Sequence, residues 1–249
     1  KISHINHILH KIYIVMRSGI ILILTVSILY GCASKNIENT LYDIESYIME
    51  RPDSALTILD TMDRSMLKSE RHRAHHALLH AMALDKNYID VSDDSIARTA
   101  VEYYSKRGPE KYEARSLYYL GLAYYYQEKY DKAILEFTKA EEIAKKSDSL
   151  YWGFIKMGQA DSYAKTHNDI EELRCIEDAY DICMNLKETY YINASKLRLA
   201  QALINLENYK KADSLLLELT ETENNDIRIR LSAMVTYAFR NTLYDDVNH

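Results

Sequence analysis

The sequence predicts an all-α protein in which antiparallel helix pairs stack side by side as a solenoid. Its 249 residues include only 6 Gly and 2 Pro, too few for the many corners of a sandwich, a barrel or another turn-rich β fold. Apolar residues recur at helical spacing along the chain, and segments with the same internal spacing return several times. Hydrophobic residues make up 47% of the chain, which is enough for a packed core and excludes a disordered protein.

The first 31 residues have the features of a processing signal. A short basic segment begins at Met16 and precedes an apolar run from Gly19 to Tyr30. The run is too short to cross a bilayer as a helix, but it fits the h-region of a secretory signal. We therefore interpret residues 1–15 as upstream sequence and residues 16–31 as a signal peptide. The alternative is an uncleaved anchor helix from Ile12 to Tyr30.

The apolar run ends in Leu29-Tyr30-Gly31-Cys32, which resembles a bacterial lipobox with an unusually bulky residue at Tyr30. The resemblance implies that Cys32 carries lipid and becomes the new N-terminus, followed by a polar tether over residues 32–39. The next residue is Ala33 and not Asp, which by resemblance to known lipoprotein sorting implies the outer membrane, facing the periplasm.

The charge balance excludes one class of partner. Residues 1–31 hold three of the 31 basic residues (Lys1, Lys11 and Arg17) and no acidic ones, which leaves 28 Lys+Arg against 37 Asp+Glu from Cys32 onward, a formal charge of −9. A net negative chain is a poor match for a phosphate backbone. We therefore expect no nucleic-acid partner.

Residues 40–249 are predicted to form the helical domain, and its first two helix pairs are readable from local signals. Helices over Leu41–Met49 and Ala55–Met62 flank Pro52, which fits the first turn of a helix. Helices over Arg73–Leu84 and Ile96–Tyr104 form the next pair, joined by a long link that ends in an acidic N-cap.

The repeat is clearest in the middle of the chain. Leu117-x2-Leu120-Gly121-x2-Tyr124 is followed by Tyr130-x2-Ala133-x3-Phe137-x2-Ala140. A copy with the same spacing reads Leu199-Ala200-x-Ala202-Leu203 and then Tyr209-x2-Ala212-x3-Leu216-x2-Leu219, and a looser copy holds Met157-Gly158-x-Ala160. Glycine inside a helix costs about 1 kcal/mol relative to alanine, so we expect a neighbouring helix to approach very closely at Gly121.

The last segment is predicted to begin another pair. Leu231–Arg240 forms its first helix, and Tyr244-Asp245-Asp246-Val247 resembles the opening of the second. A solenoid normally finishes with a capping helix. This ending is therefore typical of a chain truncated at its C-terminus.

These copies resemble the tetratricopeptide repeat (TPR) pattern W-x2-L-G-x2-Y…A-x3-F, with Leu117 in the Trp place and no Pro between repeats. The likeness covers roughly Arg73 to His249. It implies a right-handed superhelix in which the first helix of each pair lines a concave groove for a protein partner.

On each of these first helices, the residues beside those of the repeat pattern, three and four positions apart, are the candidates for the partner-binding groove. They are Tyr118, Leu122, Tyr125, Tyr126, Ile155, Gln159, Tyr163, Leu197, Gln201 and Ile204. Tyrosine is common at binding hot spots, although many of the 22 tyrosines are expected simply to pack between helices. The Lys and Asn of the TPR clamp for a C-terminal carboxylate are absent, so we expect a helical or extended apolar-aromatic peptide.

No catalytic or metal site is predicted. His72, His76 and His80 share one helix face, but Ala77 stands where a zinc hydrolase would carry its general base, and we expect a partly solvated polar face. Cys175 and Cys183 lie too far apart on one helix for a disulfide and are expected to be buried. We therefore predict no enzyme, no cofactor and no metal.

The resemblance as a whole indicates a non-catalytic, lipid-anchored TPR scaffold that holds a protein partner at the envelope of a Gram-negative bacterium. Alternatives are a glycan-binding lipoprotein of the SusD type, a component of outer-membrane protein assembly, and the sensor half of a longer signalling protein. Short loops and a lone Trp152 disfavour the first, and missing Pro and Ser motifs disfavour the second.

Overall fold

A computed structural model describes residues 37–91, 93–221 and 226–247 of the chain. The predicted signal peptide and Cys32 lie outside the described residues, as does most of the tether. Within these ranges the protein is helical and contains no strand. No helix among the described residues combines the length and the apolarity needed to span a bilayer.

A helix over residues 37–47 opens the described chain. It begins inside the segment expected to be a tether, because Ile37 continues the apolar spacing of Leu41, Ile44 and Ile48 and is buried with them. The elements that follow are α2 (Pro52–Thr61), the short 3₁₀ helix η1 (Arg64–Met66), α3 (Glu70–Lys86), α4 (Ser95–Tyr104), α5 (Glu110–Tyr126), α6 (Tyr130–Ser147), α7 (Ser149–Lys165), α8 (Asp169–Leu186), α9 (Thr189–Asn205), α10 (Tyr209–Glu221) and α11 (Ile227–Val247).

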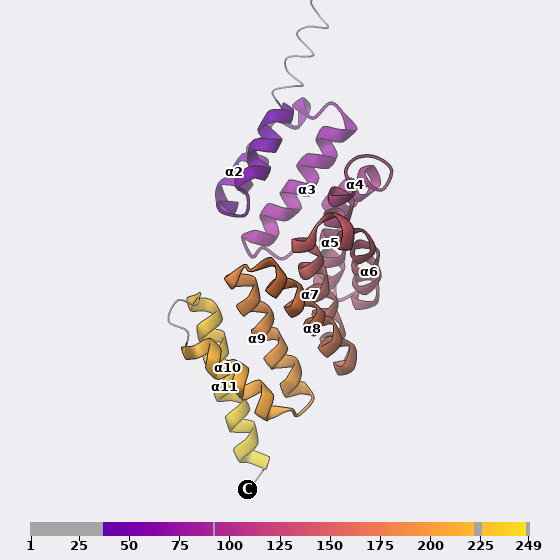
Figure 1. Cartoon of the computed structure of the whole chain (residues 1–249). Helices are drawn as coiled ribbons and strands as arrows, with labels where there is room; N and C mark the ends of the chain where they lie inside the picture. The colour runs from indigo at the N-terminus through magenta and orange to yellow at the C-terminus, as the bar shows by residue number, and fades with distance from the viewer. Residues whose placement is uncertain (1–36, 92, 222–225, 248–249) are drawn as a thin grey trace, which may run out of the picture.

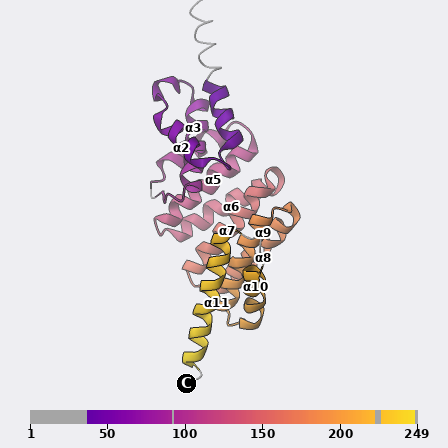
Figure 2. The ribbon, with the colours of Figure 1, turned by 90° about the vertical axis from the view of Figure 1, so that its left-hand side faces the viewer.

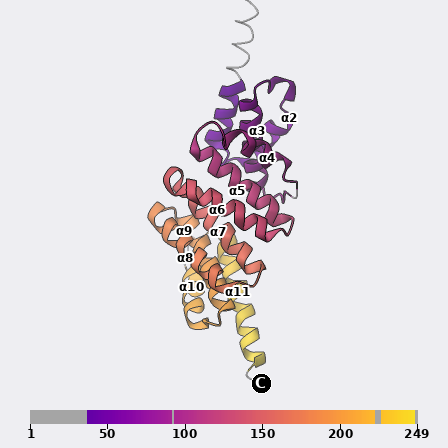
Figure 3. The same ribbon diagram turned by 90° about the vertical axis from the view of Figure 1, so that its right-hand side faces the viewer.

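The helices form a right-handed superhelical solenoid of antiparallel pairs, as predicted. Each helix packs against the next along the chain, and α5 also contacts α3 and α7 while α11 contacts α9. Figure 1 shows α2 and α3 at one end of an elongated molecule and α11 at the other. The two side views show the same order of pairs along the long axis (Figures 2 and 3).

The first helix of successive pairs ends in the same backbone turn. Tyr88, Glu128, His167 and Glu207 have positive φ angles of 56–58°, and they follow one another at intervals of 40, 39 and 40 residues. The N–H of the next residue then bonds a carbonyl five residues earlier, as from Lys129 to Tyr124 and from Asn208 to Leu203. The repeat is therefore regular in the backbone even where its sequence is degenerate.

The C-terminal prediction needs correction. Residues 244–247 do not open a second helix, because α11 continues without a break to Val247. Asn241 and Thr242 follow Arg240, and neither is a Gly or Pro that would end the helix.

Candidate functional site

A pocket of about 670 Å³ lies where five parts of the solenoid meet. Its walls come from the turn before α2, the end of α3 with the link that follows it, the end of α5, and the starts of α9 and α11. We call it the tyrosine pocket. Its lining includes the tyrosines Tyr88, Tyr126, Tyr190 and Tyr191, the acids Glu50, Asp85, Asp90, Glu188 and Asp226, and the cations Lys86 and Arg228.

The superhelical path explains why residues so distant in sequence meet here. The end of α3 lies close to the start of α9 in Figure 1. Tyr88, just after α3, accepts a hydrogen bond from Arg228 near the start of α11, across 140 residues of chain. The left-handed turn at Tyr88 ends α3 at this point and leaves its side chain 72% exposed.

Both cations of the pocket are already paired within the chain. Arg228 places its Nε 3.2 Å from one oxygen of Asp226 and its Nη2 3.2 Å from the other. Its guanidinium carbon also lies 5.4 Å from the centroid of the Tyr88 ring. Lys86 lies 3.2 Å from Asp85 and faces the Phe154 ring. Five carboxylates against two cations leave the pocket with a formal charge of −3.

The hydroxyl groups of Tyr126 and Tyr191 stay protonated near neutral pH. Burial, together with the charges of Asp85 and Asp90, raises the pKa of Tyr126 to about 12. Burial, with smaller contributions from Tyr190 and Glu188, raises the pKa of Tyr191 to about 12. These side chains therefore offer aromatic faces and neutral hydroxyl groups.

Three of the ten predicted groove residues are buried between helices, which corrects the expectation that they face a partner. Tyr118 is 7% exposed, Gln159 is 4% exposed and Ile155 is fully buried. The Tyr118 ring lies 5.6 Å from Tyr151 and 6.2 Å from Phe154. Tyr118, predicted to face a partner from α5, thus packs against α7, the first helix of the next pair.

The other predicted residues are half-buried and do not form one surface. Tyr126 lines the tyrosine pocket, and Leu122 lies in a closely packed seam beneath the link between α3 and α4. Tyr125 packs its ring against Tyr130, at 5.6 Å. Tyr163 lies against the core of α7 and α8, whereas Leu197 and Ile204 pack with α10 and α11. Gln201 is half-buried on α9.

The histidines of α3 do not form the partly solvated face that the sequence predicts. His72, His75 and His76 are buried. His76 Nε2 lies 3.0 Å from the Leu59 carbonyl oxygen, and His80 Nε2 lies 2.8 Å from Asp60. They join α3 to α2, and burial lowers the pKa of His76. No group of three or more candidate metal ligands occurs among the described residues.

The cysteine prediction is confirmed. Cys175 and Cys183 are buried free thiols. Burial raises the pKa of each. A thiol held protonated in this way is a weak nucleophile.

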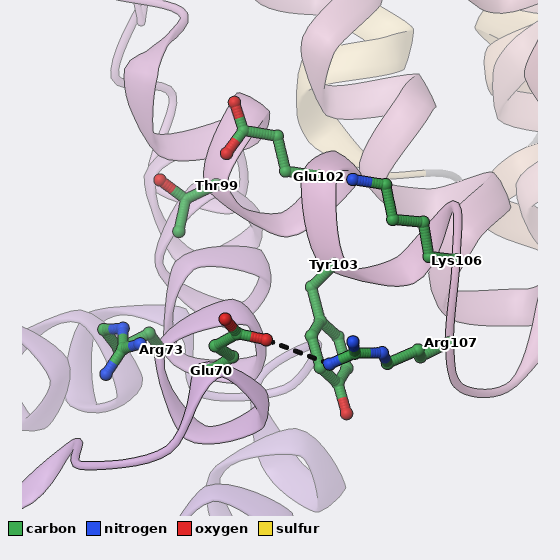
Figure 4. Close-up of a pocket in the computed structure, with 7 residues that line it drawn as sticks. All are labelled: Glu70, Arg73, Thr99, Glu102, Tyr103, Lys106 and Arg107. Carbon is green, nitrogen blue, oxygen red and sulfur yellow. Dashed lines mark hydrogen bonds and ion pairs between the residues drawn. The ribbon is translucent and has the colours of Figure 1, made fainter.

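A second hollow, of about 350 Å³, lies between α3 and α4. Figure 4 shows Glu70 and Arg107 pointing toward each other with Tyr103 beside them. The two form an ion pair of 3.0 Å. Arg73 is also engaged, since it donates to the carbonyl oxygens of Leu67 and Lys68. Glu70, Arg73 and Arg107 are thus already engaged within the chain.

Comparison with known proteins finds one repeat that matches a family by sequence and a similar fold over most of the chain. Residues 114–147 match the tetratricopeptide repeat family. They comprise most of α5 and all of α6, the segment that shows the pattern most clearly. No curated protein matches the sequence.

Similar solved structures share the fold at low sequence identity. The apo form of RapI has a TM-score of 0.60 at 15% identity. The match covers 82% of this chain and 58% of the RapI chain. The sensor-bearing signal transduction ATPase with numerous domains from Pyrococcus horikoshii has a TM-score of 0.57 at 13% identity, over 86% of this chain and 38% of its own. TPR-like repeats described as kinesin light chain, from Podosopora anserina, have a TM-score of 0.51 at 17% identity, over 83% and 93% of the two chains. Residues 114–147 of this chain therefore match the tetratricopeptide repeat family, and they lie within a TPR-like helical solenoid.

Proposed function

We propose that this protein is a non-catalytic scaffold that binds a protein partner in the tyrosine pocket and is held at the cell envelope by lipid on Cys32. The tyrosine pocket is the observation that carries the proposal. It is large, it gathers four tyrosines, and its walls come from helix ends and the turns beside them. TPR-like solenoids typically serve as protein-binding scaffolds, which supports the same reading.

Site-specific crosslinking tests the partner and the pocket together. A photo-reactive phenylalanine analogue at Tyr190, which is 43% exposed in the pocket, should capture the partner in cells. The same group at Leu135, 53% exposed on α6 and outside the pocket lining, is the matched control. Adducts at Leu135 but none at Tyr190 would show that the partner binds elsewhere.

The anchor is supported by the lipobox likeness of residues 29–32. A chain lipidated at Cys32 should fractionate with the outer membrane, and Cys32→Ala should release it into the soluble fraction. Cys183→Ala, which removes a buried thiol of α8, should leave the fractionation unchanged. Membrane association of Cys32→Ala equal to the wild type would reject the lipid anchor.

A second candidate function is the sensor part of a longer signalling chain. It is favoured by the similarity to the signal transduction ATPase, whose tetratricopeptide repeats are described as its sensor and of which this chain spans 38%. In that case the tyrosine pocket would receive the signal. The gene sequence beyond the codon for His249 decides between the two, because a further hydrophobic span and a coiled coil would favour signalling.

A further inference from the structure

Three carboxylates of the tyrosine pocket carry no counter-charge. Glu50, Asp90 and Glu188 are exposed, and the described part of the chain shows no ion pair to any of them. They come from three different elements: the turn before α2, the link after α3, and the N-cap of α9. A ligand that enters between them meets negative charge from several sides.

The chain's own Arg228 shows which chemistry this pocket accommodates. Its guanidinium lies over the Tyr88 ring and pairs with both oxygens of Asp226. An aromatic face with a carboxylate beside it is a favourable environment for a guanidinium. Tyr190 and Glu188, at the start of α9, also line the pocket, and among the described residues no cation lies over the Tyr190 ring or pairs with Glu188.

The size of the pocket favours a peptide over a small ion. At about 670 Å³ it lies within the range of sites that enclose drug-sized ligands. One ammonium ion would leave most of that space unfilled, whereas two basic side chains with the backbone between them would occupy it. Tyr126, Tyr190 and Tyr191 provide aromatic surface for the aliphatic stems of such side chains.

We propose that the tyrosine pocket recognises a basic segment of a protein partner, with arginine side chains between Glu50, Asp90 and Glu188. This inference rests on the proposed function, because it names the chemistry of the partner at the same pocket. Negative charge draws the basic segment in, and the tyrosine rings hold its guanidinium groups. The pocket correspondingly rejects acidic peptides and nucleic acid.

The test uses fluorescein-labelled peptides and the full chain in detergent. The probe is Ser-Arg-Gly-Arg-Ser, its neutral analogue carries citrulline in place of arginine, and the readout is fluorescence anisotropy. The arginine peptide should bind at least about tenfold more tightly than the citrulline peptide. Its affinity should fall as salt rises, because exposed charges are screened.

Matched variants locate the binding site. Asp90→Asn with Glu188→Gln should weaken the arginine peptide by about five- to tenfold, since each exposed charge contributes modestly. Glu142→Gln with Glu177→Gln removes the same charge from exposed positions of α6 and α8 outside the pocket lining, and it should weaken binding less than twofold. Unchanged circular dichroism and melting temperatures verify that both double variants are folded.

Each outcome separates this inference from the proposed function. Equal affinity for the two peptides, or equal loss in the two double variants, would overturn recognition of a basic segment. Tighter binding of spermidine than of the arginine peptide would overturn the peptide in favour of a free polyamine. The Tyr190 crosslink would still report the protein partner in each case, and only its absence would count against the proposed function itself.

Discussion

The Phe137 ring on α6 packs directly against the backbone of Gly121 on α5. A Cβ atom on Gly121 would lie 2.5 Å from Phe137 Cε1, which is closer than side chains approach one another. Gly158 on α7 meets the same ring, and a Cβ atom there would lie 2.7 Å from Phe137 Cζ. The fully buried Phe137 thus fixes the distances among three consecutive helices. This confirms the close approach expected at Gly121.

Gly121→Ala and Gly158→Ala should each destabilise the protein, because the Phe137 ring has no room to move in a close-packed core. Overpacking of this kind costs about 1–3 kcal/mol in the free energy of unfolding. Urea unfolding followed by circular dichroism measures the loss.

Gly153→Ala is the matched control for these two variants. Its Cβ would meet its nearest neighbours at 3.5 Å, an ordinary contact. Because alanine is the better helix former, this change should stabilise α7 by up to about 1 kcal/mol. A similar loss in all three variants would show that contact with Phe137 is not the cause.

The left-handed turns after α5 and α9 predict two stabilising substitutions. Glu128 and Glu207 both adopt a φ of 58°, where a side chain bearing a Cβ is strained. Glu128→Gly and Glu207→Gly should each raise the free energy of unfolding by about 0.5–1 kcal/mol, since glycine removes that strain at some cost in chain entropy.

The control for the turn variants is a glycine in a regular part of a helix. Glu142→Gly, within α6, should lower the free energy of unfolding by about 1 kcal/mol. If Glu128→Gly lowers it by as much, the turn after α5 is not left-handed in solution.

Local patterns in the sequence predict the helix pairs well, because propensity and apolar spacing act over a few residues. Pro52 begins α2, and the predicted helical patterns at 117–124 and 130–140 lie within α5 and α6. The accessible face of each first helix is not a local property. It depends on how far each pair rotates against the next, and here that rotation buries Tyr118 of α5 against α7 and leaves Ile155 of α7 fully buried.

The tyrosine pocket illustrates the same limit at longer range. Tyr126 was predictable because it lies on a first helix near its end. Tyr88, Tyr190 and Arg228 were not, since they flank helices and meet only through the superhelical path. The one available signal was the long link after α3, which contains Tyr88 and Asp90.

Acid should weaken the contact between the first described helix and α5 through Glu45. Burial alone would raise the pKa of Glu45, but the His75 imidazole 3.3 Å away, the hydrogen bond from Tyr112 and nearby positive charge lower it from 4.5 to about 2. A carboxyl whose pKa is lower in the folded chain stabilises the fold above pH 4.5. That stabilisation is lost as the pH falls toward 2.

Glu45→Gln tests this contribution by urea unfolding at several pH values. The variant should lose about 1–3 kcal/mol at pH 7, because the Tyr112 hydroxyl, 2.7 Å from Glu45, loses a charged partner. It should then lose less stability than the wild type between pH 4.5 and 2.5. Equal acid sensitivity of the two proteins would place the titrating group elsewhere.

Removal of Arg228 should strengthen binding of the arginine peptide. Arg228 occupies the face of Tyr88 and neutralises Asp226, so it competes with any guanidinium that enters the tyrosine pocket. Arg228→Ala leaves five carboxylates against one cation in the lining and frees the aromatic face. The anisotropy assay should show binding tightened about two- to fivefold.

Arg230→Ala removes the same charge from α11 outside the pocket lining and should change affinity little. Weaker binding in Arg228→Ala would instead mean that this arginine does not compete with the peptide but holds Tyr88 and Asp226 in the arrangement that binds it.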